Sequence, residues 1–202
     1  MNPFPHAHMH THAHTRTHTH RAWPPATRVA GSARAAGVLD AFEAALLATM
    51  NENFYPDVGG GGVEQFGATE AVNSALLQSQ EGFIRLFAMW PPDEVASFSS
   101  LRARGGFLVS AAFAGGAVVA PVSVLAAGGP GVPAAARNCS VLDPFSPAGA
   151  PPPWPPLVVR VAGGGAPVAV VADPAWSTRL PVWQFLAESG EGYEVFPAGT
   201  AK

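Results

Sequence analysis

The first hydrophobic pattern along the chain has the period of an α-helix. Over residues 33–50, apolar side chains recur at steps of three and four residues, while Asp40 and Glu43 fall on the opposite face. The apolar positions are Val38, Leu39, Phe42, Leu46 and Met50. This segment is therefore predicted to form an amphipathic helix.

A second helix is predicted after a loop. Residues 51–62 contain Asn, Pro and a run of four glycines, which are residue types of loops and turns. The helix is expected over 68–81, because Thr69 can cap its N-terminus and Gly82 is typical of the position after a helix end. Its apolar positions, which we expect to pack against the first helix, are Val72, Ala75, Leu76 and Leu77.

Beyond Gly82 the hydrophobic period shortens to that of β-strands. The stretches "GFLVSAAF" and "AVVAPVSVLA" flank Gly115 and Gly116 as a hairpin, in which Pro121 favours an edge strand. Further short strands are predicted in "FIRLFAMW", "NCSVLDPF", "PLVVRVAGG", "APVAVVAD" and "EGYEVFPAG". Helices come first and strands follow, without βαβ alternation. The pattern predicts an α+β protein in which residues 83–202 form an antiparallel β-domain.

Composition narrows the classes of partner. The net charge is -3 and charged residues make up 12% of the chain, so there is no basic patch of the kind that binds nucleic acid. The charge-free stretch 105–136 is long enough to span a membrane, but its glycines and prolines disfavour a spanning helix. We therefore expect neither nucleic-acid binding nor membrane insertion.

The histidines and the cysteine limit the chemistry of the folded part. All 7 histidines lie in residues 5–21. Such a tract can bind a metal weakly, but its polar composition predicts that residues 1–28 are disordered. The rest of the chain has no histidine, so we expect neither histidine acid/base chemistry nor a histidine-ligated metal there. The first residues lack the apolar core of a signal peptide, and localisation stays open.

Cys139, the single cysteine, is expected to be a small buried hydrophobe.

A family resemblance appears at the junction between the predicted helices and strands. The stretch "GGGVEQFGATEAVNSALLQSQEGFIRLFAMWP", followed by "ASFSSLRARGGFLVSAAF", resembles the C-terminal part of glycoside hydrolase family 95, which contains α-L-fucosidase-like six-hairpin glycosidases. "NCSVLDPF" is similar to a later strand of that family. The resemblance covers roughly 38–198 and is strongest over 59–113. It implies that residues 29–82 are the last helices of an (α/α)6 barrel and that a C-terminal β-domain follows.

The chain also departs from the family pattern. The family's fucosidases carry an Asp-Gly-Asn-Phe-Gly loop whose Asp supports catalysis, and Val63 stands at the position of that Asp. Glu64 comes one residue later, as in a divergent branch whose loop reads "GGGIE". Gln80 replaces a family histidine. The barrel helices that would carry the general acid are not in this chain, which implies a C-terminal fragment.

Glu64 is the predicted catalytic residue. The preceding glycines permit backbone angles with φ > 0 and close approach to a ligand, so we expect Glu64 at the rim or floor of a concavity. Inverting glycosidases need two acidic or water-orienting groups, one on each side of the scissile bond. The alternative is a solvated loop acid.

The substrate-binding residues predicted around Glu64 are Gln65, Asn53, Asp57 and Trp90. Amides and carboxylates can bond sugar hydroxyls, and an aromatic ring can stack on a pyranose. Their alternative roles are helix capping for Gln65, turn formation for the Asn and Asp, and core packing for the Trp. Three cations, Arg85, Arg102 and Arg104, are expected to be surface or inter-domain ion-pair residues.

The resemblance implies a function for a longer parent enzyme. That enzyme would hydrolyse terminal α-L-fucosyl or similar bonds of a carbohydrate substrate, without a cofactor, and this chain alone would be inactive. The alternative is a non-catalytic carbohydrate-binding or structural β-domain. A third hypothesis is metal binding by the histidine tract. The glycan and the oligomeric state stay open.

Overall fold

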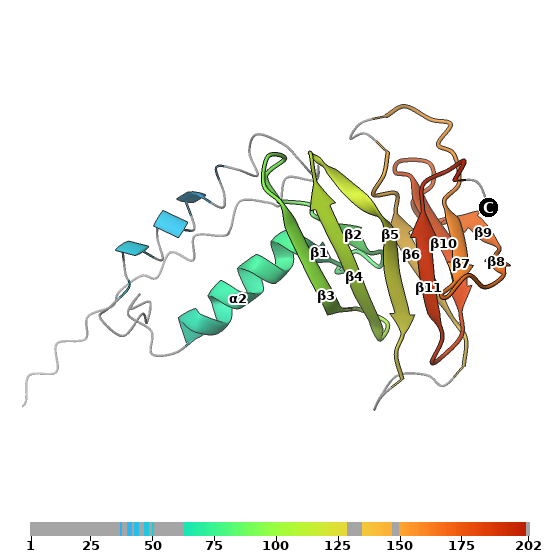
Figure 1. Ribbon diagram of the computed structural model, residues 1–202, viewed down its shortest axis with the longest axis horizontal. Coiled ribbons are helices and arrows are strands. Elements are labelled where there is room, and N and C mark those ends of the chain that lie inside the picture. The colour runs from blue at the N-terminus through green and yellow to red at the C-terminus, as the bar shows by residue number, and fades with distance from the viewer. Residues whose placement is uncertain are drawn as a thin grey trace, which may run out of the picture.

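A computed structural model describes residues 63–128, 135–146 and 150–200, together with eight separate residues between Gly37 and Met50. For residues 63–69 it describes the backbone and not the side chains. Within these ranges it contains one helix with defined ends, α2 (Val63–Leu76), and eleven β-strands (Figure 1). The predicted disordered segment 1–28 lies outside the described residues.

The strands form two packed layers. The larger sheet has six strands in the order β3-β4-β5-β11-β7-β8. Their bounds are β3 Ala96–Ala103, β4 Phe107–Ala114, β5 Ala117–Ala126, β11 Gly192–Phe196, β7 Val158–Val161 and β8 Pro167–Val168. The smaller sheet has the order β6-β10-β9, with β6 Arg137–Leu142, β10 Val182–Ala187 and β9 Val170–Ala172. All neighbouring strands of both sheets are antiparallel.

A short hairpin extends the smaller sheet. β1 (Leu77–Gln78) pairs with β2 (Arg85–Leu86), and the residue before β2, Ile84, forms a parallel bridge to Val141 of β6. The Ile84 N–H donates to the Ser140 carbonyl at 2.8 Å, and the Leu142 N–H donates to the Ile84 carbonyl at 2.9 Å. The hairpin is therefore part of the β-domain.

The core lies between the two layers. On β4 every second side chain is buried, and Val109 faces Val124 of β5 on the same side of the sheet. The smaller layer contributes Cys139, Val141 and Phe185 to the same cluster. Because both layers bury apolar side chains in one continuous cluster, the hydrophobic effect holds them face to face.

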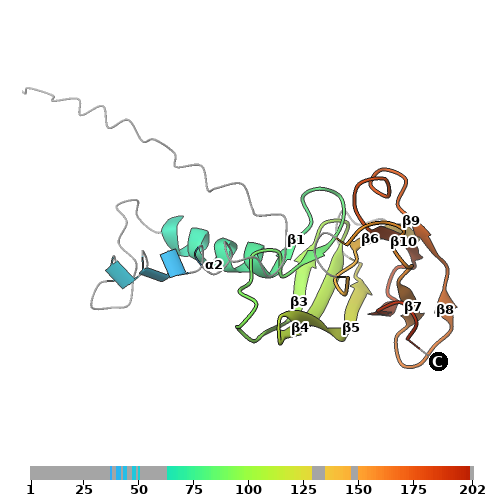
Figure 2. The same cartoon turned by 90° about the horizontal axis from the view of Figure 1, so that it is seen from above.

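α2 lies beside the β-domain and contacts it with its C-terminal end (Figures 1 and 2). Ala75 and Leu76 are buried there, whereas Val72, one turn earlier, is 39% exposed. The Phe87 N–H donates to the Leu76 carbonyl at 2.7 Å, which ties the end of α2 to the chain just after β2.

The prediction that residues 29–82 are the last helices of a six-hairpin barrel is wrong. A barrel helix buries an apolar stripe along its length. Here the described part of the chain has one helix with defined ends, α2, against eleven strands, and Leu47, one of the separate described residues before it, is 62% exposed. Only the last turn of α2 has buried side chains among those described. The protein is mostly β, and the predicted antiparallel β-domain is confirmed.

The second helix also begins and ends at residues other than those predicted. It begins at Val63, so Thr69 lies inside it and does not cap it, and it ends at Leu76. Leu77 pairs with Leu86 instead of continuing the helix. Gly82, with φ of 88°, belongs to the β1–β2 turn. Its conformation there is one that glycine adopts without a steric penalty.

The predicted hairpin around Gly115 and Gly116 is confirmed as β4 and β5, with φ of 61° and 78° at the two glycines. No helix in the described part of the chain is long and apolar enough to cross a membrane. Pro121, however, is not on an edge strand, because β5 lies between β4 and β11. It lies where the β4–β5 register shifts, opposite the step from Ser110 to Ala112. A bulge tolerates the missing proline N–H.

Cys139 yields a prediction about pH. Its side chain is fully buried, and burial raises the pKa of the thiol above its usual range, although the nearby Arg137 charge acts in the opposite direction. The folded state therefore keeps the thiol neutral, while the unfolded state ionises above a pKa of about 8.5. The contribution of the buried neutral thiol to the free energy of unfolding is therefore fully present below that pH. Above it the contribution falls by at most about 1.4 kcal/mol per pH unit.

Urea unfolding at pH 7, 8.5 and 10, under reducing conditions, measures this effect. The wild type should lose more stability between pH 8.5 and 10 than Cys139→Ala, whose own stability is lower at every pH because of the cavity. Equal pH slopes in the two proteins would contradict the buried neutral thiol.

Candidate functional site

The structure places only some of the predicted site residues. Glu64 and Gln65 belong to the first turn of α2, and their side chains are outside the described atoms. Asn53 and Asp57 also lie outside the described residues. Trp90 is half-buried and packs against the core, where its Nε1 is buried with no hydrogen-bond partner among the described residues. The roles predicted for these residues stay predictions.

The helix separates Glu64 from Trp90. The Trp90 N–H donates to the Phe87 carbonyl, and the chain there passes beside Ala75 at the end of α2. Eleven residues separate Glu64 from Ala75, or roughly 16 Å along a helix that rises 1.5 Å per residue. The described backbone therefore does not bring Glu64 and Trp90 to one point, and Glu64 lies within a helix and not on the loop before it.

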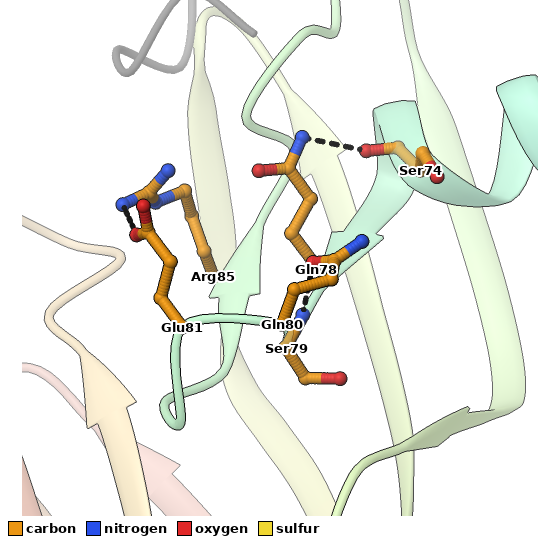
Figure 3. A network of polar contacts seen from close by, with 6 residues as sticks. All are labelled: Ser74, Gln78, Ser79, Gln80, Glu81 and Arg85. Atoms are coloured by element: carbon orange, nitrogen blue, oxygen red, sulfur yellow. Dashed lines mark hydrogen bonds and ion pairs between the residues drawn. The ribbon is translucent and has the colours of Figure 1, made fainter.

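Polar side chains gather instead on the β1–β2 hairpin (Figure 3). Gln78 donates from Nε2 to the Ser74 carbonyl of α2 at 3.0 Å. The Ser79 N–H donates to Gln80 Oε1 at 3.0 Å. These bonds hold the hairpin to the end of the helix and fix the shape of its turn. The Gln80 position, where the family has a histidine, is thus part of an exposed turn.

Arg85 is the buried cation of the hairpin. Its Nη2 donates to Glu81 Oε2 at 2.7 Å, and the exposed fractions of the two side chains are 7% for Arg85 and 43% for Glu81. The guanidinium also lies over the Phe83 ring, 5.1 Å from its centroid. Arg85 Nε is buried and has no partner in the described part of the structure.

The expectation for the three arginines is correct in part. Arg102 and Arg104 are exposed, but Arg85 is buried, although it does form an ion pair. A cavity of about 10 Å³ beside the hairpin is lined by Arg85 and Glu81. It is close to the smallest space that holds one water molecule.

A larger cavity, of about 190 Å³, lies where the β1–β2 turn, the β3–β4 turn and β6 meet. We call it the Arg104 pocket. Its lining includes Ser79, Phe83, Arg104, Phe107, Asn138 and Ser140. None of the described lining residues is an Asp or Glu. The cavity is smaller than the roughly 300–1,000 Å³ of typical ligand sites, so it suits one small polar group.

Hydrogen bonds fix the walls of the Arg104 pocket. The Arg104 N–H donates to Ser79 Oγ at 3.0 Å, and Arg104 Nη1 donates to the Gln80 carbonyl at 3.3 Å. Arg137 donates from Nε to the Gly105 carbonyl at 2.6 Å, and from Nη2 to the carbonyls of Gly106 and Ala127. The two turns are therefore held at a fixed separation.

Behind the pocket lies a buried polar network that is structural. Ser140 donates from Oγ to Asp173 Oδ2 at 2.7 Å, and Gln184 donates from Nε2 to Ser140 Oγ at 3.1 Å. The other carboxylate oxygen of Asp173 accepts from the Ala175 N–H at 2.9 Å. Because these bonds give the buried Asp173 carboxylate partners within the fold, it fixes the following turn.

The arrangement of the described residues can bind a polar ligand but supplies no paired acids for hydrolysis. No group of three or more His, Cys, Asp and Glu that could hold a metal ion occurs among them. Sequence reasoning missed Asn138 as a pocket residue, although its segment "NCSVLDPF" was part of the resemblance. Comparison with models of protein families and with curated proteins finds no match to the chain.

Proposed function

We propose that the chain is the C-terminal β-domain part of a glycoside hydrolase that resembles α-L-fucosidases. In this proposal, hydrolysis of a terminal α-L-fucosyl or similar bond belongs to a longer parent polypeptide. The observation that carries the proposal is that three stretches quoted for the resemblance, 76–82, 101–107 and 138–145, meet in one structural unit.

The contacts between the three stretches are specific. Ser79 and Gln80, of the first stretch, accept hydrogen bonds from the backbone and side chain of Arg104, in the second. Ile84, directly after the first stretch, exchanges backbone hydrogen bonds with the third through Ser140 and Leu142. Motifs that are far apart in sequence thus lie together in the fold, as they would in the C-terminal β-domain that the resemblance implies.

The proposal divides the chemistry between this chain and the parent. Glu64, in the first turn of α2, is the carboxylate that we assign to the active site. A glycosidase acts on both sides of the scissile bond, and the resemblance implies that the second group comes from barrel helices of the parent. The β-domain would supply a rigid support and, through its turns, contacts to the carbohydrate.

The purified chain alone is expected to show no turnover of an aryl α-L-fucoside above the uncatalysed rate. The reason is that one of the two groups that act on the bond is missing. A sensitive fluorogenic assay measures this directly. Turnover by this chain that is lost in Glu64→Gln would contradict the proposal that hydrolysis requires the longer parent polypeptide.

A second candidate function is a non-catalytic carbohydrate-binding domain. The observation that favours it is the Arg104 pocket, whose described lining residues include polar groups but no carboxylate. The two functions differ in what a longer polypeptide does. Hydrolysis by the longer polypeptide favours the glycosidase, whereas sugar binding without hydrolysis by any polypeptide that contains this chain favours the binding domain.

A further inference from the structure

We propose that the Arg104 pocket binds the carboxylate-bearing end of an acidic sugar, such as a uronic acid. The sugar part of this inference rests on the proposed function, whereas the preference for a carboxylate rests on the pocket alone. The pocket is separate from Glu64, which lies at the far end of α2 from the hairpin.

The charge of the lining selects an anion. Arg104 is the charged residue among the described lining residues, and none of these is an Asp or Glu. Its side chain donates one bond, to the Gln80 carbonyl at 3.3 Å, and forms no ion pair with a described residue. A guanidinium has five N–H donors in a planar fork, which matches the two oxygens of a carboxylate.

Two charged groups lie behind the lining: the Asp173 carboxylate, which accepts a hydrogen bond from Ser140, and a second cation, Arg137. The Arg137 guanidinium lies over the Phe107 ring, 4.9 Å from its centroid, and bonds the carbonyl of Gly105 in the pocket wall. Its Nη1 is buried without a partner among the described residues. This charge is partly withdrawn from water, so it is screened less than a surface charge.

The neutral lining groups suit the hydroxyls of a sugar. Asn138 is exposed on β6, and its side-chain amide makes no hydrogen bond with a described side chain or backbone group. It offers two donors and one acceptor oxygen. Phe83 and Phe107 give an apolar wall for the ring carbons. The volume of about 190 Å³ limits the ligand to one sugar unit or its end.

The test is a titration of the full chain with D-glucuronate, D-glucose and acetate, followed by NMR shift changes at low salt. Glucuronate should bind roughly tenfold or more tightly than glucose, because the charged hydrogen bonds to Arg104 are lost in glucose. It should also bind more tightly than acetate, because acetate has no hydroxyls for Asn138. Equal affinities for glucuronate and glucose would overturn the carboxylate preference, and equal affinities for glucuronate and acetate would overturn the sugar.

The variants assign the effect to the pocket. Arg104→Gln should weaken glucuronate binding roughly tenfold or more, and Asn138→Ala should weaken glucuronate but not acetate. Arg102→Gln is the matched control, because it removes the same charge from an exposed position outside the pocket. Equal losses in Arg102→Gln and Arg104→Gln, or the absence of saturable binding in the wild type, would overturn the inference. Thermal unfolding of each variant, unchanged from the wild type, verifies that folding is intact.

This result is independent of the proposed glycosidase. Glucuronate binding together with a longer polypeptide that hydrolyses nothing would uphold the pocket and contradict the proposed function. Hydrolysis by a longer polypeptide whose β-domain does not bind glucuronate would support the proposed function and contradict the pocket.

Discussion

Phe87→Ala is expected to lower the free energy of unfolding by about 3–5 kcal/mol, which is the usual range for removing a buried phenylalanine. The Phe87 side chain is 0% exposed. Its ring lies 5.4 Å from that of Phe98 on β3 and 5.1 Å from that of Phe113 on β4, while its N–H bonds the end of α2. The substitution therefore leaves a cavity where the helix, the hairpin and the large sheet meet.

Equilibrium urea unfolding measures this loss. Phe196→Ala is the matched control, because Phe196 ends β11 and is half-exposed, with Arg160 over its ring. Its loss should be about 1 kcal/mol, as is usual for single substitutions. A similar loss in the two variants would mean that the junction at Phe87 is not a central part of the core.

Glu64→Gln, made in a longer parent polypeptide that hydrolyses an α-L-fucoside, is expected to lower kcat by on the order of 10²–10⁴-fold. This is the range for loss of a positioned acid or base, since glutamine keeps the shape of glutamate but cannot take or give the proton. Steady-state kinetics over a range of substrate concentrations measure kcat and KM separately.

Glu70→Gln on the same helix serves as the control. Glu70 is exposed, and its carboxylate accepts a hydrogen bond from Ser74 within the helix. Its kcat should stay close to that of the parent. A loss confined to KM in Glu64→Gln would make Glu64 a binding residue, and unchanged kinetics would show that it is a solvated acid.

The β-domain could be predicted because its strands alternate strongly. Every second side chain of β4 is buried, β5 buries three valines and Ala126, and two glycines mark the turn between the strands. The edge strand β3 gave no such signal. It carries three serines, and its pairing with β4 is irregular between Phe98 and Leu101.

β10 was also missed, although it is the middle strand of the smaller sheet. Both Val182 and Phe185 are buried, three positions apart, so the apolar residues do not show the two-residue period of a strand that is buried on one face. The turn that begins at Asp173 packs Trp176 against Phe83, and the Asp173 N–H bonds the Val182 carbonyl of β10. The contact between Trp176 and Phe83 joins residues far apart in sequence, so the local pattern does not show it.

The end of α2 and the site depend on pairing that the local sequence does not specify. The apolar run Ala75 to Leu77 fits a helix as well as a strand. Leu77 forms a strand because it pairs with Leu86. In the same hairpin Arg85 pairs with Gln78 and is buried. The sequence thus supplied the motifs of the candidate site, but only the fold places Arg104 beside Asn138.

The central claim is that this chain is the β-domain part of a glycosidase whose activity requires a longer polypeptide. The most direct measurement is the initial rate of aryl α-L-fucoside hydrolysis by the longest polypeptide encoded in frame with this chain, compared with the 202-residue chain alone. The account predicts turnover by the longer polypeptide and none by the chain alone. Turnover by the chain alone, or failure of a folded longer polypeptide to hydrolyse any α-L-fucoside or similar glycoside, would contradict it.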